Sequence, residues 1–197
     1  MKVYGITGGV GAGKTSVLEL IKGMTNCRII IADELAKSLE KKGQPCYEPL
    51  VGLLGRDILD ENEEIDKKKM AQAIFLNKED NLSRVNAIIH PEVKKRILEI
   101  IDNETAKGEI DYLFIEAALL IEDGYDCICD EIWYLYADES VRRKRLKESR
   151  GYTDDKIDAI LASQLDEATF RKYCKTVLDN SGDLKATENQ LKHIFGR

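Results

Sequence analysis

Apolar residues occur along this chain in two kinds of pattern. Short runs rich in β-branched and aromatic residues predict strands, and they lie at Val3–Thr7, Cys27–Ile31, Asp111–Glu116, Glu131–Tyr136 and Thr176–Leu178. Longer stretches with apolar positions three and four residues apart predict helices, and outside the middle of the chain they lie at Thr15–Lys22, Glu34–Lys42, Asp138–Ser149, Thr153–Glu167 and Leu184–His193.

Residues 47–107 show helical patterns without a strand, with turns expected near Gly55–Glu64, Asn77–Asp80 and His90–Pro91. Elsewhere strands alternate with helices, which is typical of a parallel sheet covered on both faces. The pattern therefore predicts a single α/β domain of three α/β/α layers, with its core at residues 1–33 and 108–197. Residues 34–107 are then a helical insertion beside the sheet edge where ligands bind, and we expect this insertion to recognise a substrate.

A glycine-rich segment separates the first strand from the first helix. Gly8-Gly9-Val10-Gly11-Ala12-Gly13-Lys14-Thr15 fits the P-loop pattern G-x-x-x-x-G-K-[ST] in the strand-to-helix context that the motif requires. In such a loop, backbone N–H groups surround phosphate oxygens, the lysine reaches the β- and γ-phosphates, and the hydroxyl binds Mg²⁺. The motif predicts a P-loop NTPase fold whose ATP site comprises Gly9, Gly11, Ala12, Gly13, Lys14, Thr15 and Ser16, with Lys14 catalytic and Thr15 the Mg²⁺ ligand. No G-x-G-x-x-G spacing fits these glycines, which disfavours a dinucleotide-binding fold.

Two carboxylates follow predicted strands. Asp33 lies just after the second strand, on the same sheet edge as the P-loop, where it is a candidate base for an acceptor hydroxyl. The alternative is that Asp33 only caps the following helix. Glu116 ends the third strand, and it is either a water-mediated Mg²⁺ contact or a carboxylate at a strand end with no further role.

Basic residues crowd the helix expected at Asp138–Ser149, although the chain as a whole is acidic. Such runs usually form a solvated surface, but in a P-loop kinase an arginine-bearing helical hairpin closes over the phosphates. Arg142 and Arg145 lie one turn apart on one helix face. We therefore expect both to be catalytic phosphate contacts within a lid at residues 142–168.

Composition limits the classes of partner. The chain has 197 residues, a formal net charge of -6 and a pI of about 5.2, which disfavours binding to nucleic acid or to an anionic membrane. No apolar run reaches transmembrane length, and no leader peptide is expected before the first strand. Five cysteines without a C-x-x-C pair indicate free thiols in a reducing compartment, so a cytoplasmic location is expected.

Several ordered segments together resemble the dephospho-CoA kinase family over essentially the whole chain. They are Gly5–Lys14, Ala32-Asp33 with Leu35-Ala36, Asn86–Val93 with its His90-Pro91 pair, Leu119-Leu120 before Glu122, and Leu178–Gly182. The P-loop alone is unspecific, but this ordered set is specific to the family. One departure is Glu116, which stands where the family usually has aspartate.

The resemblance implies transfer of the γ-phosphoryl group of ATP to the ribose 3′-hydroxyl of dephospho-CoA, which gives coenzyme A and ADP in the last step of coenzyme A biosynthesis. It makes Asp33 the base, His90 a substrate contact in the insertion, and the arginine hairpin the lid, with Mg²⁺ as cofactor. Histidine before proline alternatively marks a helix start. Two other readings stay open, namely another P-loop small-molecule or nucleotide kinase and a nucleotide-binding regulatory protein. A monomer or a small homo-oligomer is expected.

Overall fold

The chain divides into two units in the computed structural model, which describes residues 1–76, 78–117 and 119–196. The first unit comprises Met1–Ile30 and Glu104–Arg197, and the second comprises Ile31–Asn103. Among the described residues, no helix is both long enough and apolar enough to cross a membrane. Each unit is described separately below.

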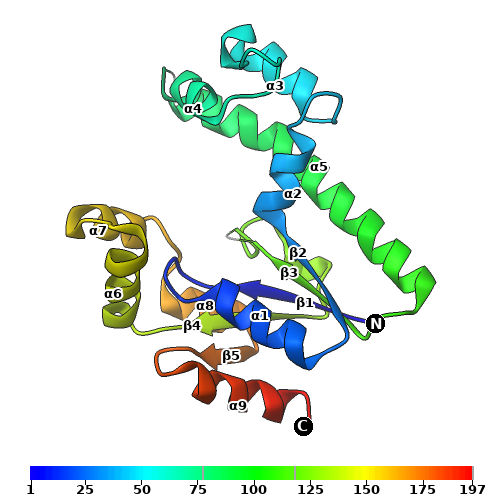
Figure 1. The fold of residues 1–197 in the computed structure, drawn as a ribbon, viewed down its shortest axis with the longest axis vertical. Helices are drawn as coiled ribbons and strands as arrows, with labels where there is room; N and C mark the ends of the chain where they lie inside the picture. Colours follow the sequence, from blue (N-terminus) through cyan, green and yellow to red (C-terminus); the bar gives the residue numbers. More distant parts are fainter. Residues whose placement is uncertain (77, 118, 197) are drawn as a thin grey trace. The chain divides into compact units, whose positions relative to one another are not determined.

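A sheet organises the first unit (Figure 1). Its strands lie in the order β2 (Cys27–Ile31), β3 (Tyr112–Glu116), β1 (Lys2–Thr7), β4 (Glu131–Tyr136) and β5 (Thr176–Asp179). β1 pairs in parallel with β3 and β4, and β4 pairs in parallel with β5. The register places Ile6 beside Glu116 and Thr7 beside Tyr134, so the carboxyl ends of these strands meet at one edge.

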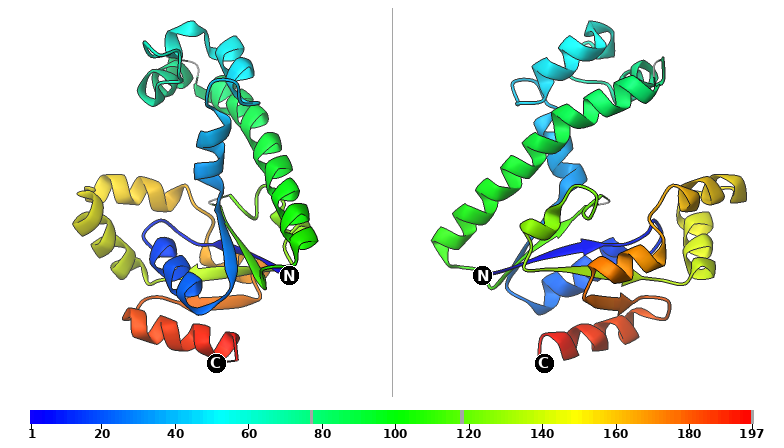
Figure 2. Two further views of the ribbon diagram at one scale, coloured as in Figure 1. Left: turned by 45° about the vertical axis from the view of Figure 1, so that its right-hand side comes forward. Right: turned by 180° about the vertical axis from the view of Figure 1, so that it is seen from behind.

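Helices cover both faces of this sheet. The helical elements of this unit are α1 (Lys14–Met24), the 3₁₀ helix η2 (Tyr125–Cys127), α6 (Glu139–Arg150), α7 (Asp154–Ala162), α8 (Glu167–Tyr173) and α9 (Leu184–Ile194), of which α1 and α9 cover one face and α8 the other. Seen from behind in Figure 2, α8 lies in front of the strands and α1 behind them. The predicted three-layer α/β/α fold is therefore confirmed.

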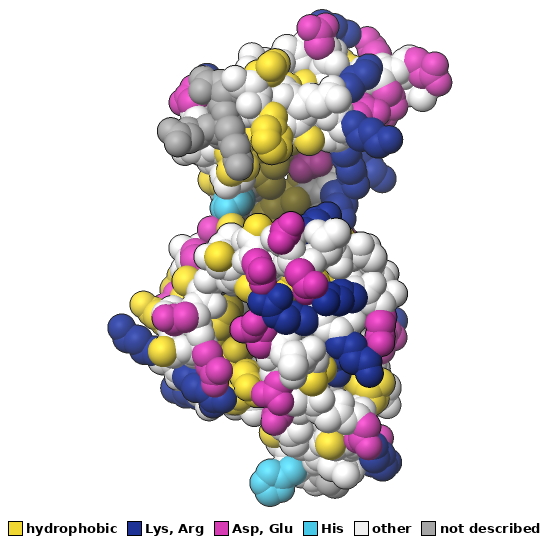
Figure 3. Space-filling model, turned by 90° about the vertical axis from the view of Figure 1, so that its left-hand side faces the viewer, with side chains coloured by type: hydrophobic (Ala, Val, Ile, Leu, Met, Phe, Trp, Pro, Cys, Tyr) yellow, Lys and Arg dark blue, Asp and Glu magenta, His cyan; other side chains and the backbone are white. Residues whose placement is uncertain are grey.

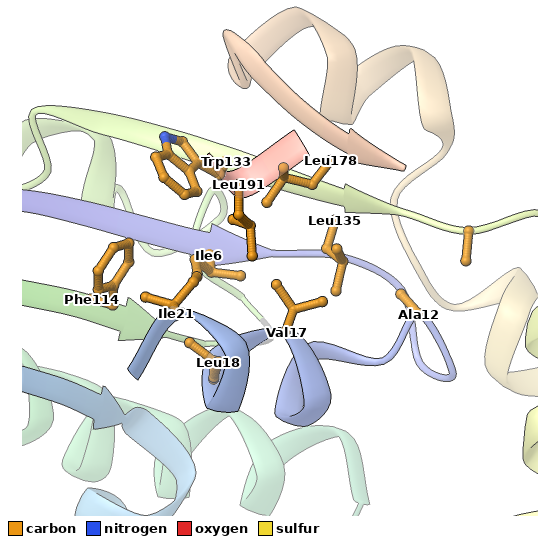
Figure 4. Close-up of a cluster of buried hydrophobic side chains, with 11 residues drawn as sticks. Ile6, Ala12, Val17, Leu18, Ile21, Phe114, Trp133, Leu135, Leu178 and Leu191 are labelled. Atoms are coloured by element: carbon orange, nitrogen blue, oxygen red, sulfur yellow. The ribbon is translucent and has the colours of Figure 1, made fainter. Parts of the chain in front are cut away.

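The alternation of side chains along β4 explains how both faces are covered. Trp133 and Leu135 point to the face of α1 and α9 and lie in a buried cluster with Leu191 (Figure 4). Tyr134 points to the opposite face, where its ring stacks on Phe170 of α8 with centroids 4.6 Å apart and planes 7° from parallel. Each face of the central strands thus has its own apolar packing.

One helix expected in this unit is instead two. The pattern predicted a single helix over Thr153–Glu167, but α7 ends at Ala162 and α8 begins at Glu167. Asp166 caps the new helix, because its carboxylate accepts a hydrogen bond of 2.8 Å from the backbone N–H of Thr169.

The second unit is helical. Its elements are α2 (Ala32–Leu39), α3 (Tyr47–Leu54), the 3₁₀ helix η1 (Arg56–Ile58), α4 (Lys67–Leu76) and most of α5 (Lys78–Lys107). The buried side chains of Leu50 in α3, Ile58 in η1 and Met70 in α4 belong to elements that contact one another. An isolated antiparallel bridge joins Leu59 to Ile65 between η1 and α4.

The turn expected at His90–Pro91 is wrong, because α5 runs through Pro91 without a break. Proline inside a helix removes one backbone hydrogen bond at a cost of about 3 kcal/mol. Val85, Val93 and Ile97 are buried at helical spacing on both sides of Pro91, so one packing stripe continues across it. The turn expected at Asn77–Asp80 includes residue 77, which lies outside the described residues.

Packing of α9 on the sheet gives a first test. Leu191→Ala removes a side chain that is 0% exposed in the cluster of Figure 4, and should lower the free energy of unfolding by about 2–5 kcal/mol. Leu184→Ala, in the same helix but 48% exposed, should change it by about 0.5 kcal/mol at most. Urea unfolding followed by circular dichroism measures both. Equal losses would contradict the placement of α9.

Candidate active site

The glycine loop joins β1 to α1 at the carboxyl edge of the sheet. Gly11 and Gly13 have φ angles of 85° and 93°, in the left-handed region that favours glycine, and Gly13 is the N-cap residue of α1. The loop is closed by a 3.1 Å hydrogen bond from Ala12 N–H to the carbonyl of Gly9. Lys14, Thr15 and Ser16 form the first turn of α1, where free N–H groups and the helix dipole favour an anion.

The Lys14 side chain is held at the base of this loop. Its ammonium group donates a 2.8 Å hydrogen bond to the carbonyl of Gly8 and lies 3.5 Å from a carboxylate oxygen of Glu116. Both side chains are largely buried, at 17% and 15% exposure. Glu116 reaches Lys14 because β3 is paired with β1. In this structure Glu116 is therefore a charge partner that positions the lysine.

Two arginines of α6 turn toward the loop. Arg142 donates from Nε to the carbonyl of Val10 at 3.0 Å and from Nη2 to the side chain of Gln164, in the segment between α7 and α8. Burial lowers the pKa of Arg142 from its usual value, but a guanidinium remains protonated at neutral pH. Arg145 donates to the carbonyl of Ala12 at 3.2 Å and to that of Asn180 at 2.9 Å.

Arg143, Lys144 and Lys147 of α6 form ion pairs with nearby carboxylates. Arg143 contacts Glu139 at 2.7 Å and Asp158 at 2.5 Å, and Lys147 contacts Asp154 at 2.7 Å. Figure 3 looks onto the side that carries α6 and α7, where basic and acidic side chains lie next to one another. The basic run therefore has two parts, a neutralised surface and two arginines directed at the glycine loop.

Asn180 is a part of this site that the sequence analysis did not single out as a site residue. It follows β5, is 1% exposed, and donates from Nδ2 to the carbonyl of Ala12 at 2.7 Å. Its Oδ1 accepts a 2.9 Å hydrogen bond from the hydroxyl of Thr187 in α9. The segment Leu178–Gly182 is one of those that resemble the family. The burial of the Asn180 amide, however, depends on how β5 and α9 pack, which no sequence motif indicates.

Asp33 and His90 belong to the second unit. Asp33 is the second residue of α2, whose N-cap is Ile31 and has no side-chain capping bond, so Asp33 is an exposed carboxylate and not the capping residue. His90 lies within the continuous helix α5, so it does not mark a helix start. The structure thus brings the loop glycines, Lys14, Arg142 and Arg145 together in the first unit, and the roles of Asp33 and His90 stay predictions.

The collected groups suit a polyphosphate. Loop N–H groups, one ammonium and two guanidinium groups converge on the carboxyl edge of the sheet, although the chain has a net charge of -6. Among the described residues, no group of three or more His, Cys, Asp or Glu side chains could hold a metal ion.

Comparisons with known proteins agree with this chemistry. A family model described as dephospho-CoA kinase matches residues 2–186. A dephospho-CoA kinase of Carboxydothermus hydrogenoformans is 33% identical over 195 residues, covering 99% of this chain and 93% of that protein. One of Aquifex aeolicus is 34% identical over 196 residues, covering 99% and 96%. A crystal structure from Thermus thermophilus, 26% identical, superposes with a TM-score of 0.80 over 99% of this chain and 96% of that one. The resemblance noted in the sequence is confirmed.

The glycine loop can be tested by adding one methyl group. A Cβ at Gly13 would lie 2.4 Å from Nδ2 of Asn180 and would occupy a left-handed conformation that costs about 1–2 kcal/mol. Gly13→Ala should therefore lower the melting temperature and abolish detectable binding of Mg·ATP in calorimetry.

Gly23→Ala is the matched control for this change. It lies in the same helix, α1, and its Cβ would meet nothing within 4 Å. This variant should gain about 0.5–1 kcal/mol of stability and bind Mg·ATP normally. Normal binding by Gly13→Ala would refute the loop geometry.

Proposed function

The chain belongs to the dephospho-CoA kinase family, and we propose that its glycine loop and the two α6 arginines handle the ATP phosphates while its second unit presents dephospho-CoA. It is an ATP-dependent kinase that transfers the γ-phosphoryl group to the ribose 3′-hydroxyl of dephospho-CoA, giving coenzyme A and ADP. The observation that carries the phosphate side is the convergence of Lys14, Arg142 and Arg145 on one loop. The family match supports the acceptor, and it disfavours another small-molecule kinase.

The loop and its cations have separate tasks on the phosphate side. The backbone amides from Gly9 to Ser16 surround the β- and γ-phosphates, and the Lys14 ammonium group contacts oxygen atoms of both phosphates. A Cβ at Gly9 would lie 2.2 Å from Nη2 of Arg142, so this guanidinium lies directly over the loop. Arg142 and Arg145 neutralise the charge that develops on the transferred group, within a lid at residues 142–168.

Mg²⁺ is the expected cofactor, and the residues present fit it. The hydroxyl of Thr15 is exposed in the first turn of α1, next to the loop that binds the phosphates. Mg²⁺ is usually held by one or two protein ligands together with phosphate oxygens and water, so a single hydroxyl suffices here. When bound there, the ion would neutralise negative charge on the phosphates. Glu116 is a weaker candidate because its carboxylate is engaged by Lys14.

The second unit supplies the acceptor side of the proposal. Asp33 is an exposed carboxylate in the first turn of α2, available to accept the proton of the 3′-hydroxyl as it attacks. His90 on α5 lies in the segment that matches the family's His-Pro motif, and we assign it to contact with dephospho-CoA. A cytoplasmic location and a monomeric or small oligomeric state stay predictions.

A direct assay tests this function. The purified protein is incubated with Mg·ATP and, in separate reactions, with dephospho-CoA, AMP, CMP, gluconate, pantothenate or shikimate, and products are identified by mass spectrometry. Only dephospho-CoA should gain a phosphoryl group, with one ADP formed per coenzyme A. Phosphorylation of another acceptor would overturn the acceptor assignment but leave the phosphate site intact. ATP hydrolysis without any phosphorylated acceptor would favour a nucleotide-driven regulator.

The role of Asp33 is tested by removing its charge. Asp33→Asn should lower kcat about 100-fold or more, because general-base assistance is lost, while the affinity for Mg·ATP stays within about twofold. Glu34→Gln removes the neighbouring exposed carboxylate of the same helix and should leave kcat unchanged. Lys14→Ala should instead weaken nucleotide binding itself. Near-normal kcat in Asp33→Asn would exclude this residue as the base.

A further inference from the structure

Asn180 makes hydrogen bonds with both its side chain and its backbone at the back of the glycine loop. Its side chain joins the carbonyl of Ala12 to the hydroxyl of Thr187 at 2.7 and 2.9 Å. Its backbone N–H donates to the carbonyl of Tyr136 at 2.8 Å, and its carbonyl accepts from Arg145 at 2.9 Å. A residue only 1% exposed with this many partners has one orientation available.

The orientation of its amide is fixed by chemistry. The carbonyl of Ala12 can only accept, so the atom that faces it must be the donor Nδ2. The hydroxyl of Thr187 then donates to Oδ1 on the other side. A flipped amide would place two acceptors against each other at the Ala12 carbonyl.

This contact determines where the next N–H group points. Peptide bonds are planar and trans, so the carbonyl of Ala12 and the N–H of Gly13 point in opposite directions. Asn180 holds the carbonyl toward β5 and α9, and the Gly13 N–H therefore faces away from them, to the open side of the loop. A Cβ at Gly13 would lie 2.4 Å from Nδ2, so the amide packs directly on this peptide.

Arg145 shares the carbonyl of Ala12 with Asn180, at 3.2 Å. In the proposed function Arg145 neutralises charge on the transferred phosphoryl group, and a guanidinium engaged by that group would no longer be available to the carbonyl of Ala12. Asn180 is then the donor that remains, since its side chain is buried and directed at the loop. An unsupported buried carbonyl would favour rotation of the peptide and loss of the N–H from the phosphate site.

We infer that Asn180 is a positioning residue of the phosphate site, which fixes the Ala12–Gly13 peptide so that the Gly13 N–H faces the phosphates of ATP. The inference rests on the proposed function and assigns no contact between Asn180 and the nucleotide. Thr187 acts one step further back by fixing the amide of Asn180.

Inorganic pyrophosphate with Mg²⁺ is the probe, because it has phosphates but no base or sugar. Asn180→Leu should weaken its binding about tenfold in calorimetry, as expected for loss of a buried hydrogen bond that orients a ligand-binding group. Thr187→Val, which keeps the side-chain shape, should weaken it less. In ¹H–¹⁵N spectra, the shift of the Gly13 amide on addition of pyrophosphate should shrink in both variants.

Ser181→Ala is the matched control. Ser181 is the next residue of the same loop, and its hydroxyl accepts from the N–H of Asp138 at 2.9 Å and not from the glycine loop. Its affinity for pyrophosphate should equal that of the unaltered protein. Thermal unfolding of all three variants shows whether they fold. If Asn180→Leu does not fold, the pyrophosphate affinity of Thr187→Val tests the positioning role.

The other possible binding results would each refute either the positioning role of Asn180 or the phosphate site. Unchanged pyrophosphate binding with weakened ADP binding would show that Asn180 acts on the base or sugar and would refute the positioning role. Unchanged binding of both ligands would refute it as well. Failure of the unaltered protein to bind pyrophosphate would overturn the phosphate site itself, and is thereby distinguished from failure of the positioning role alone.

Discussion

The carbonyl groups of a phosphate-binding loop must point away from the phosphates if its N–H groups are to point toward them, because each peptide unit is planar and trans. Two carbonyls of the present loop are held by side chains from outside it. Arg142 binds the carbonyl of Val10, and Asn180 and Arg145 bind that of Ala12. Glycine at positions 11 and 13 permits the left-handed conformations that this arrangement needs. The loop is thus oriented by two side chains of α6 and by the side chain of the residue that follows β5.

The positive charge at the phosphate site also comes from side chains around the loop and not from the chain as a whole. A chain with a net charge of -6 repels a polyphosphate at long range, so attraction must come from groups close to the loop. Pairing of Arg143 and Lys147 with surface carboxylates keeps those cations from competing for the anion. Arg142 and Arg145 are instead bonded to neutral carbonyls, which leaves their positive charge uncompensated near the loop.

Much of this arrangement could be predicted from the sequence, because it depends on local chemistry. The strand, glycine loop and helix at the amino terminus follow from short-range patterns, and all five expected strands are present with boundaries that differ by one residue at most. The errors had two causes, namely tertiary packing that outweighs a local preference and a local cap inside an expected helix. A continuous apolar stripe carries α5 through Pro91, and the cap at Asp166 starts a helix inside an expected one. The burial of Asn180 required a partner, Thr187, that no local pattern connects to the P-loop.

The helix α9 links the stability of the sheet to the geometry of the loop. One face places Leu191 in the buried cluster beneath β4. Another places Gln190 against β5, where its side chain accepts from the N–H of Asp179 at 2.9 Å and donates to its carbonyl at 2.8 Å, in the manner of a neighbouring strand. The third contact, Thr187 to Asn180, lies one helical turn before these two in the sequence. Since all three depend on the docking of one helix, any change that loosens α9 also loosens the support of the Ala12–Gly13 peptide. Under the positioning role inferred for Asn180, phosphate binding and the docking of α9 are coupled, each stabilising the other by the same free energy.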